Sequence, residues 1–205
     1  MKTTPEISYI ISAYNRPALL PVCLWSLYAQ THTDFEVLVT DNATDKKIAA
    51  KQRDIVASMK DSRFKYVNTA TRIKVSDCYW SAEYGMKHTT GKWICFPCDD
   101  TYYVPQWAQR MLTTAVSGNL DLVLCESAVY GPDTNGCSTY YLVHRSDIWP
   151  GGKPSFLVKR SVFPSWINKP TVSTCSGVDR ATLLAMTNDR RIKHGGCSGL
   201  YYVHN

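Results

Sequence analysis

Short apolar runs that alternate with helix-like segments are the feature that most restricts how this sequence can fold. The runs are rich in β-branched and aromatic residues, as buried strands are, and cover residues 7–12, 35–40, 64–67, 93–96 and 120–125. Stretches with apolar residues at helical spacing separate them, at 19–30, 45–59, 76–88 and 105–116. This alternation predicts an α/β fold with a Rossmann-like, mostly parallel central sheet flanked by helices.

The pattern changes after residue 126, where Gly, Pro, Tyr and charged residues become frequent. Strand-like runs follow at 139–143, 156–159 and 200–204, with one helix-like segment at 178–188. A length of 205 residues favours one domain with a sizeable core. We therefore expect a single domain, 1–205, in which about 126–205 continues the sheet that about 1–125 begins.

The net charge of +6 and the pI of about 8.8 narrow the possible partners without identifying one. A modest positive excess attracts phosphates, nucleic acid or an acidic membrane surface, but the sequence has no dense basic run. Residues 1–6 are polar and give no secretory signal, and no apolar stretch approaches the roughly 20 residues that span a bilayer. The sequence therefore predicts a cytoplasmic protein without a transmembrane segment.

The eight cysteines predict reduced thiols that fill the core, because the chain shows no secretory signal. Cys95 and Cys98 form a C-x-x-C motif, which is also found in redox sites. A thioredoxin-like site needs this motif at the start of a helix, whereas here it follows an apolar, strand-like run. No second C-x-x-C pair is present to complete a zinc site.

Polar residues follow three of the predicted strands directly. Tyr14-Asn15 follows the first, Asp41-Asn42 the second, and Asp99-Asp100 the run at 93–96. In open α/β sheets, ligands bind beyond the carboxyl ends of the strands, so these tips predict a site. Two adjacent carboxylates repel each other unless a cation or a proton relieves them, and a hard divalent cation suits their oxygens. The alternative is a solvated loop in which an aspartate forms a turn or caps a helix.

Several of these pieces, taken in order, resemble the family 2 glycosyltransferases of the GT-A fold. The matching segments are residues 10–17 (IISAYNRP), 26–31 (SLYAQT), 35–42 (FEVLVTDN), 91–94 (GKWI), the pair Asp99-Asp100, and 102–105 (YYVP). The resemblance is good from residue 7 to about 120 and thin beyond. Cys98 departs from the acidic DXD-type motif of the family, because many relatives have an aspartate at that position.

The resemblance implies an enzyme that uses a nucleotide-diphosphate sugar, with a UDP-sugar as the expected donor. It assigns contacts with this donor to Ala13, Tyr14, Asn15, Arg16, Asp41, Arg72, Asp99 and Arg160. It assigns the ligation of Mn²⁺ or Mg²⁺ to Asp100 and His204. The alternatives are a solvated loop residue for Arg72, a surface charge for Arg160 and an inert position near the chain end for His204.

The family also implies a carboxylate in the second half that takes the acceptor's proton when the transfer inverts the sugar's configuration. Asp179, in Ser-Gly-Val-Asp-Arg at 176–180, fits this position. The alternative is an ordinary acidic residue in the first turn of a helix, where the helix dipole favours it.

Two other functions and several acceptors remain open at this point. One alternative is a nucleotidyltransferase, although residues 13–17 lack the glycines usual in such phosphate-binding loops. The other is a domain that binds a nucleotide or a glycan without turnover. The acceptor could be a glycan, a lipid-linked glycan, a protein or a modified nucleic-acid base, and residues about 126–205 are expected to bind it.

Overall fold

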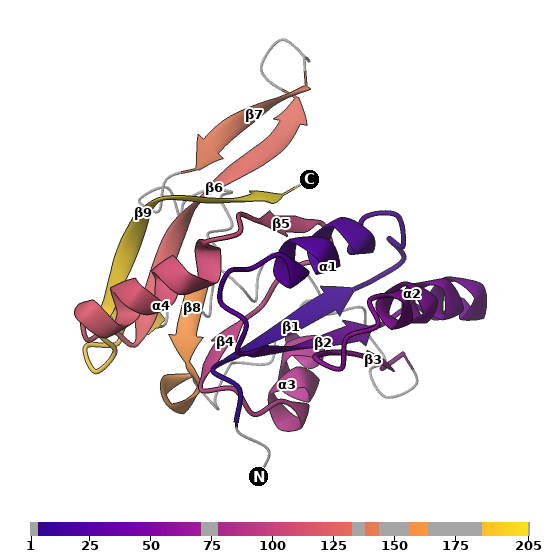
Figure 1. The fold of residues 1–205 in the computed structure, drawn as a ribbon, viewed down its shortest axis with the longest axis horizontal. Coiled ribbons are helices and arrows are strands. Elements are labelled where there is room, and N and C mark those ends of the chain that lie inside the picture. The colour runs from indigo at the N-terminus through magenta and orange to yellow at the C-terminus, as the bar shows by residue number, and fades with distance from the viewer. Residues whose placement is uncertain (1–3, 71–77, 133–137, 144–155, 164–185, 205) are drawn as a thin grey trace.

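A computed structural model describes residues 4–70, 78–132, 138–143, 156–163 and 186–204. The strands are β1 (Ile7–Ala13), β2 (Phe35–Asp41), β3 (Phe64–Asn68), β4 (Trp93–Cys95), β5 (Thr101–Tyr103), β6 (Leu122–Pro132), β7 (Ser138–Val143), β8 (Phe156–Lys159) and β9 (His194–His204). The helices are α1 (Leu20–Tyr28), α2 (Lys46–Ser58), α3 (Cys78–His88), α4 (Trp107–Ser117) and the 3₁₀ turn η2 (Arg160–Val162). Together they form the predicted α/β fold (Figure 1).

The described strands form one nine-stranded sheet in the order β3-β2-β1-β4-β8-β6-β9-β5, with β7 paired to β6. The first four of these strands are parallel to one another, as the alternation predicted. β8 runs antiparallel to both β4 and β6, so it reverses direction within the sheet. β6 and β9 are again parallel, and the edge strand β5 is antiparallel to β9.

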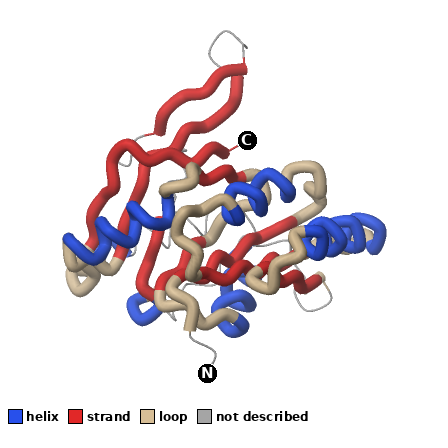
Figure 2. The backbone as a smooth tube through the Cα atoms, in the orientation of Figure 1, coloured by secondary structure: helices blue, strands red, loops and turns tan. Residues whose placement is uncertain are grey.

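The two faces of the sheet carry separate apolar cores, because side chains alternate along each strand. Tyr9 and Ile11 of β1 belong to the larger core, which packs against α1, α2 and α4. Ile10 points to the other face, where Met86 of α3 packs against the smaller core. Figure 2 shows helices on both sides of the sheet, as in a doubly wound fold.

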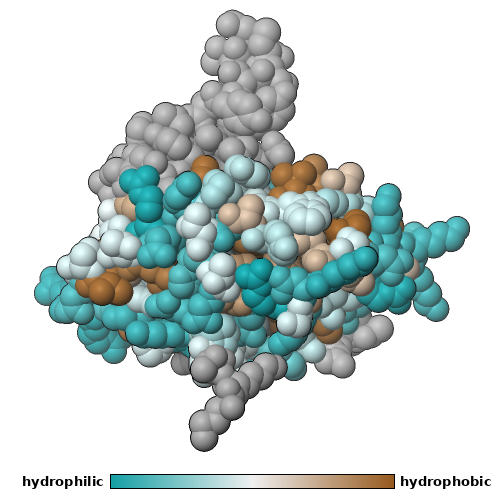
Figure 3. All heavy atoms as spheres, in the orientation of Figure 1, coloured by the Kyte–Doolittle hydropathy of each residue, from teal (hydrophilic) through white to brown (hydrophobic). Residues whose placement is uncertain are grey.

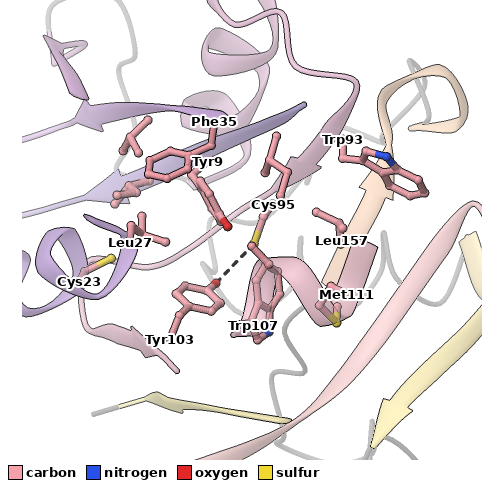
Figure 4. Close-up of a cluster of buried hydrophobic side chains, with 14 of the residues drawn as sticks. Tyr9, Cys23, Leu27, Phe35, Trp93, Cys95, Tyr103, Trp107, Met111 and Leu157 are labelled. Carbon is pink, nitrogen blue, oxygen red and sulfur yellow. Dashed lines mark hydrogen bonds between the residues drawn. The ribbon is translucent and has the colours of Figure 1, made fainter. Parts of the chain in front are cut away.

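Aromatic residues fill the centre of the larger core and contact the end of β4, the strand that precedes Asp99. Tyr9, Tyr103 and Trp107 lie with ring centroids 4.7 to 6.3 Å apart. The Tyr103 hydroxyl and the Cys95 Sγ are 3.4 Å apart, as Figure 4 shows. Because Cys95 ends β4, this packing fixes the start of the loop that carries the two aspartates.

Gln30 joins the end of α1 to the segment that follows the two aspartates. Its amide nitrogen donates to the Val104 carbonyl at 2.8 Å, and its amide oxygen accepts from the Ala108 N–H at 2.9 Å. The second bond satisfies one of the free N–H groups in the first turn of α4. Gln30 is 4% exposed, so the link is protected from water. It holds in place the segment that follows the Asp99-Asp100 loop.

The coloured part of the surface in Figure 3 is mostly hydrophilic, and the apolar residues on it are scattered. None of the helices in the described part of the chain has the length and apolar character needed to cross a membrane.

Candidate nucleotide-sugar site

The carboxyl ends of β1, β2 and β4 bring the three predicted polar tips together. Ala13 pairs with Asp41 in the parallel ladder, and the Asn42 N–H donates to the Ala13 carbonyl at 3.0 Å. On the other side of β1, Ser12 forms a parallel bridge with Cys98. The Tyr14 N–H donates to Asp99 Oδ2 at 3.2 Å. The predicted meeting of these tips is therefore observed.

Asp99 and Asp100 form a buried pair of carboxylates, with side chains 0% and 2% exposed. The guanidinium of Arg16 contacts both: Nη2 lies against Asp99 Oδ1, and Nη1 donates to Asp100 Oδ2. Arg16 comes from the loop after β1, where Asn15 adopts a left-handed backbone with φ of 55°. Arg16 was predicted to contact the donor, but its contact with both aspartates was not predicted.

Burial and the neighbouring charges act in opposite senses on the pKa values of Asp99 and Arg16, and both values end up raised. Burial raises the pKa of Asp99 from its ordinary 3.8 to about 6, although Arg16 and the Tyr14 N–H favour the ionised form. Burial acts to lower the pKa of Arg16, but the charges of Asp99 and Asp100 outweigh it and raise that pKa. Asp99 is thus an acid whose charge depends closely on the cations around it.

Asp41 lies fully buried at the tip of β2, with partners for both carboxylate oxygens. The Tyr66 hydroxyl donates to Oδ2 at 2.6 Å, and the Ala43 N–H donates to Oδ1 at 2.8 Å. Burial, together with the hydrogen bond to Asp41, raises the pKa of Tyr66. Because a carboxylate oxygen can accept more than one hydrogen bond, Asp41 still has the capacity to accept a nucleobase N–H. Tyr66 was not predicted, since an aromatic residue in a short strand looks like any core residue.

The Tyr14 side chain is 44% exposed at the same edge of the sheet, between the tips of β2 and β4. An exposed aromatic ring offers a flat face on which a planar base can stack. Cys98, which stands where many relatives have an aspartate, is partly buried beside these residues. The five cysteines whose side chains are described are not in disulfides, and Cys95 ends a strand rather than starting a helix, which argues against a thioredoxin-like site.

The position of Arg160 differs from the prediction, because the structure places this residue at the edge of the sheet opposite the aspartates. β8 is antiparallel to β4, so the residue after β8 lies near the amino ends of β1 and β4. There its guanidinium donates to the carbonyls of Gly91 at 2.6 Å and Met86 at 3.0 Å, and to the hydroxyl of Ser8 at 3.0 Å. A predicted donor contact by Arg160 does not fit this position.

The remaining predicted residues are only partly covered by the structure. Arg72 and Asp179 lie outside the described residues. The backbone of His204 pairs with Thr101, the residue that follows Asp100, so this position lies beside the aspartate pair. In the described part of the chain, no group of three or more Asp, Glu, His or Cys side chains gathers as a ready metal site.

Comparisons with known proteins agree with this geometry. A family model described as "Glycosyl transferase family 2" matches residues 8–181. The putative glycosyltransferase EpsH of Bacillus subtilis is 28% identical over 139 residues, which are 64% of this chain and 36% of EpsH. The uncharacterized glycosyltransferase YibD of Escherichia coli is 24% identical over 128 residues, 62% of this chain and 35% of YibD. This chain therefore spans about a third of the length of these two relatives.

Solved structures show the same fold. The crystal structure of S. aureus TarS 1-349 has a TM-score of 0.70 with 17% identity, and the match covers 98% of this chain and 60% of that one. The same fragment in complex with UDP-GlcNAc matches with a TM-score of 0.68 and 17% identity, over 98% of this chain and 59% of that one.

Proposed function

The chain belongs to glycosyl transferase family 2, and from that membership we propose that it transfers a sugar from a UDP-sugar to an acceptor hydroxyl. The observation that supports this most directly is the convergence of the β1, β2 and β4 tips, which places Tyr14, Asp41, Arg16 and the aspartate pair at one edge. The complex of UDP-GlcNAc with TarS, which has the same fold, supports a nucleotide-sugar donor.

In this proposal the two ends of the site bind different parts of the donor. Asp41, held by Tyr66 and Ala43, accepts an N–H of the base, and the exposed Tyr14 ring stacks on it. Asp99 and Asp100 face the ribose and the diphosphate. Arg72 remains a predicted contact with the base or a phosphate, since it lies outside the described residues.

The residues present suit a Mn²⁺ or Mg²⁺ ion, the proposed cofactor. Asp99 and Asp100 offer buried carboxylate oxygens, which hard divalent cations prefer, and His204 lies in the strand beside them. Two described carboxylates are too few for a full ligand set, so the donor's phosphates are expected to share the coordination. When bound, such an ion stabilises the charge that grows on the leaving diphosphate.

The chemical step needs a group that removes the acceptor's proton, and Asp179 is the proposed base of an inverting transfer. The acceptor classes named from the sequence, the cytoplasmic location and the inverting outcome all stay predictions. So does the assignment of residues about 126–205 to acceptor binding.

Calorimetry with UDP, with and without Mn²⁺, tests the donor site directly. We expect Mn²⁺ to strengthen UDP binding by the wild type, and Asp100→Asn to abolish this effect. Asp54→Asn is the matched control, because Asp54 is an exposed acid on α2 whose partner is Arg53. A panel of nucleotide sugars, assayed for UDP release with candidate acceptors, then tests turnover. The proposal is wrong if the wild type binds neither UDP nor any UDP-sugar under either condition.

A further inference from the structure

The loop after β1 places the side chain of Arg16 against both aspartates of the site. Arg16 reaches Asp99 with one guanidinium nitrogen and Asp100 with the other, so a single planar group spans the pair. The carboxylates are buried, whereas the Arg16 side chain is 44% exposed. The aspartates are therefore fixed in the protein, whereas the Arg16 guanidinium that contacts them lies at the surface of the site.

A metal ion and the Arg16 guanidinium compete for the same two carboxylates. An ion bound by Asp99 and Asp100 would stand beside a positive group that lies within hydrogen-bonding range of both carboxylates, and like charges that close repel each other. Metal binding therefore requires Arg16 to move away or to be compensated by new negative charge. A nucleotide diphosphate supplies that charge.

Arg16 has a place to go when the diphosphate arrives. Its exposed side chain can turn without opening the apolar core, and guanidinium groups bind phosphate oxygens in the same two-pronged manner as carboxylates. Tyr14 and Asp99 stay connected through the Tyr14 N–H, so the backbone near Arg16 can keep its position during this change.

We infer that Arg16 is a built-in competitor of the metal, which holds the aspartate pair until the donor's diphosphate draws the guanidinium away. This inference rests on the proposed function, because the diphosphate is the group that receives Arg16. It assigns an order to the site: the divalent ion binds tightly only together with the nucleotide, and hardly at all to the free protein.

The inference predicts effects of opposite sign in one variant. Arg16→Gln removes the competing charge, so Mn²⁺ alone should bind about tenfold tighter or more than to the wild type, as expected for the loss of one neighbouring like charge. The same variant should bind UDP in the presence of Mn²⁺ about tenfold more weakly, because a charge-assisted phosphate contact is lost. Mn²⁺ titration followed by electron paramagnetic resonance measures the first effect, and calorimetry with UDP measures the second.

Two further variants keep the test decisive. Arg53→Gln removes an exposed arginine that pairs with Asp54 on α2, and it should leave both affinities at the wild-type values. Arg16→Lys keeps the charge but lacks the planar fork that contacts both carboxylates at once, so it should fold even if Arg16→Gln does not. It should bind Mn²⁺ alone more tightly than the wild type but less tightly than Arg16→Gln, because the like charge remains.

The outcomes separate this inference from the proposed function. Unchanged or weaker binding of Mn²⁺ alone by the Arg16 variants would show that Arg16 is a permanent structural partner of the aspartates, and would overturn the inference. If the wild type binds no UDP, the proposed function is wrong instead. The inference then fails as well, because no diphosphate draws Arg16 away. Tighter Mn²⁺ binding by the variants together with weaker UDP binding supports both.

Discussion

Arg160 should stabilise the fold rather than bind the donor, and its removal gives the clearest test of the structural reasoning. Its guanidinium donates to four acceptors at 2.6 to 3.0 Å: the Ser8 hydroxyl of β1 and, within residues 86–91, the Met86 and Gly91 carbonyls and the Thr89 hydroxyl. These contacts join the end of β8 to β1, α3 and the start of β4. Arg160 is thus a bridge between the two halves of the sheet.

The expected magnitude follows from the number of bonds. At roughly 1 kcal/mol net for each hydrogen bond, Arg160→Met should lower the free energy of unfolding by about 4 kcal/mol. Arg160→Lys keeps a charge but cannot span the four acceptors, so about half of that loss is expected. Arg191→Met is the control, because Arg191 is an exposed arginine paired with the nearby Asp189, and its loss should leave the free energy of unfolding close to the wild-type value.

Urea unfolding, followed by circular dichroism, measures these differences at an unchanged dependence on denaturant. UDP affinity, measured at low temperature on the fraction that remains folded, should equal the wild-type value in both Arg160 variants. A stable Arg160→Met protein with weakened UDP binding would refute the reasoning and restore the donor contact that the sequence suggested.

Three other predictions concern the site and its support. The pKa of Asp99 is about 6 in the folded protein, above the ordinary 3.8, so the folded state holds this proton more tightly than the unfolded state does. The free energy of unfolding should therefore fall as the pH rises from about 4 to 6, by up to about 1.4 kcal/mol per pH unit. Asp99→Asn should lack this slope in urea titrations. Gln30→Ala should lower the free energy of unfolding by about 2 kcal/mol in the same assay, since it removes the acceptor of the Ala108 N–H and one of the two donors to the Val104 carbonyl, which keeps the Trp107 N–H. Asp179→Asn should keep the UDP affinity and lose transfer by a factor on the order of 10² or more in a UDP-release assay, and a fully active variant would place the base elsewhere.

The parallel half of the fold could be predicted because its signals are local. Each strand from β1 to β4 is a short apolar run, and a polar tip follows three of them directly. Since parallel strands share one carboxyl edge, the meeting of Tyr14, Asp41 and Asp99 follows from the alternation alone. Even Arg16 was placed in the site, although its contact with both carboxylates depends on the left-handed turn at Asn15, which no periodicity reveals.

In the second half, strands were predicted near β7, β8 and the end of β9, but their pairing and several bounds were not, because most partners lie far apart in the sequence. β5 has only three residues and finds its partner, β9, about a hundred residues later, so no local pattern announces it. β6 extends to Pro132, whereas the sequence suggested an end at residue 125, because its pairing with β7 carries it past the expected turn. Tyr66 and Gln30 support the site through contacts with distant segments, and neither residue type is unusual at its position.

Strand direction explains why one distant residue fits the site and another does not. β8 is antiparallel to β4, so its carboxyl end, with Arg160, lies at the edge opposite the aspartates. β6 is antiparallel to β8 and β9 is parallel to β6, so β9 runs in the same direction as β1 and β4. The carboxyl end of β9 therefore reaches the donor edge, and there His204 pairs with Thr101 beside the aspartate pair. Arg160 was predicted as a donor contact and His204 as a metal ligand, and the two reversals of direction around β8 leave only His204 at the donor edge.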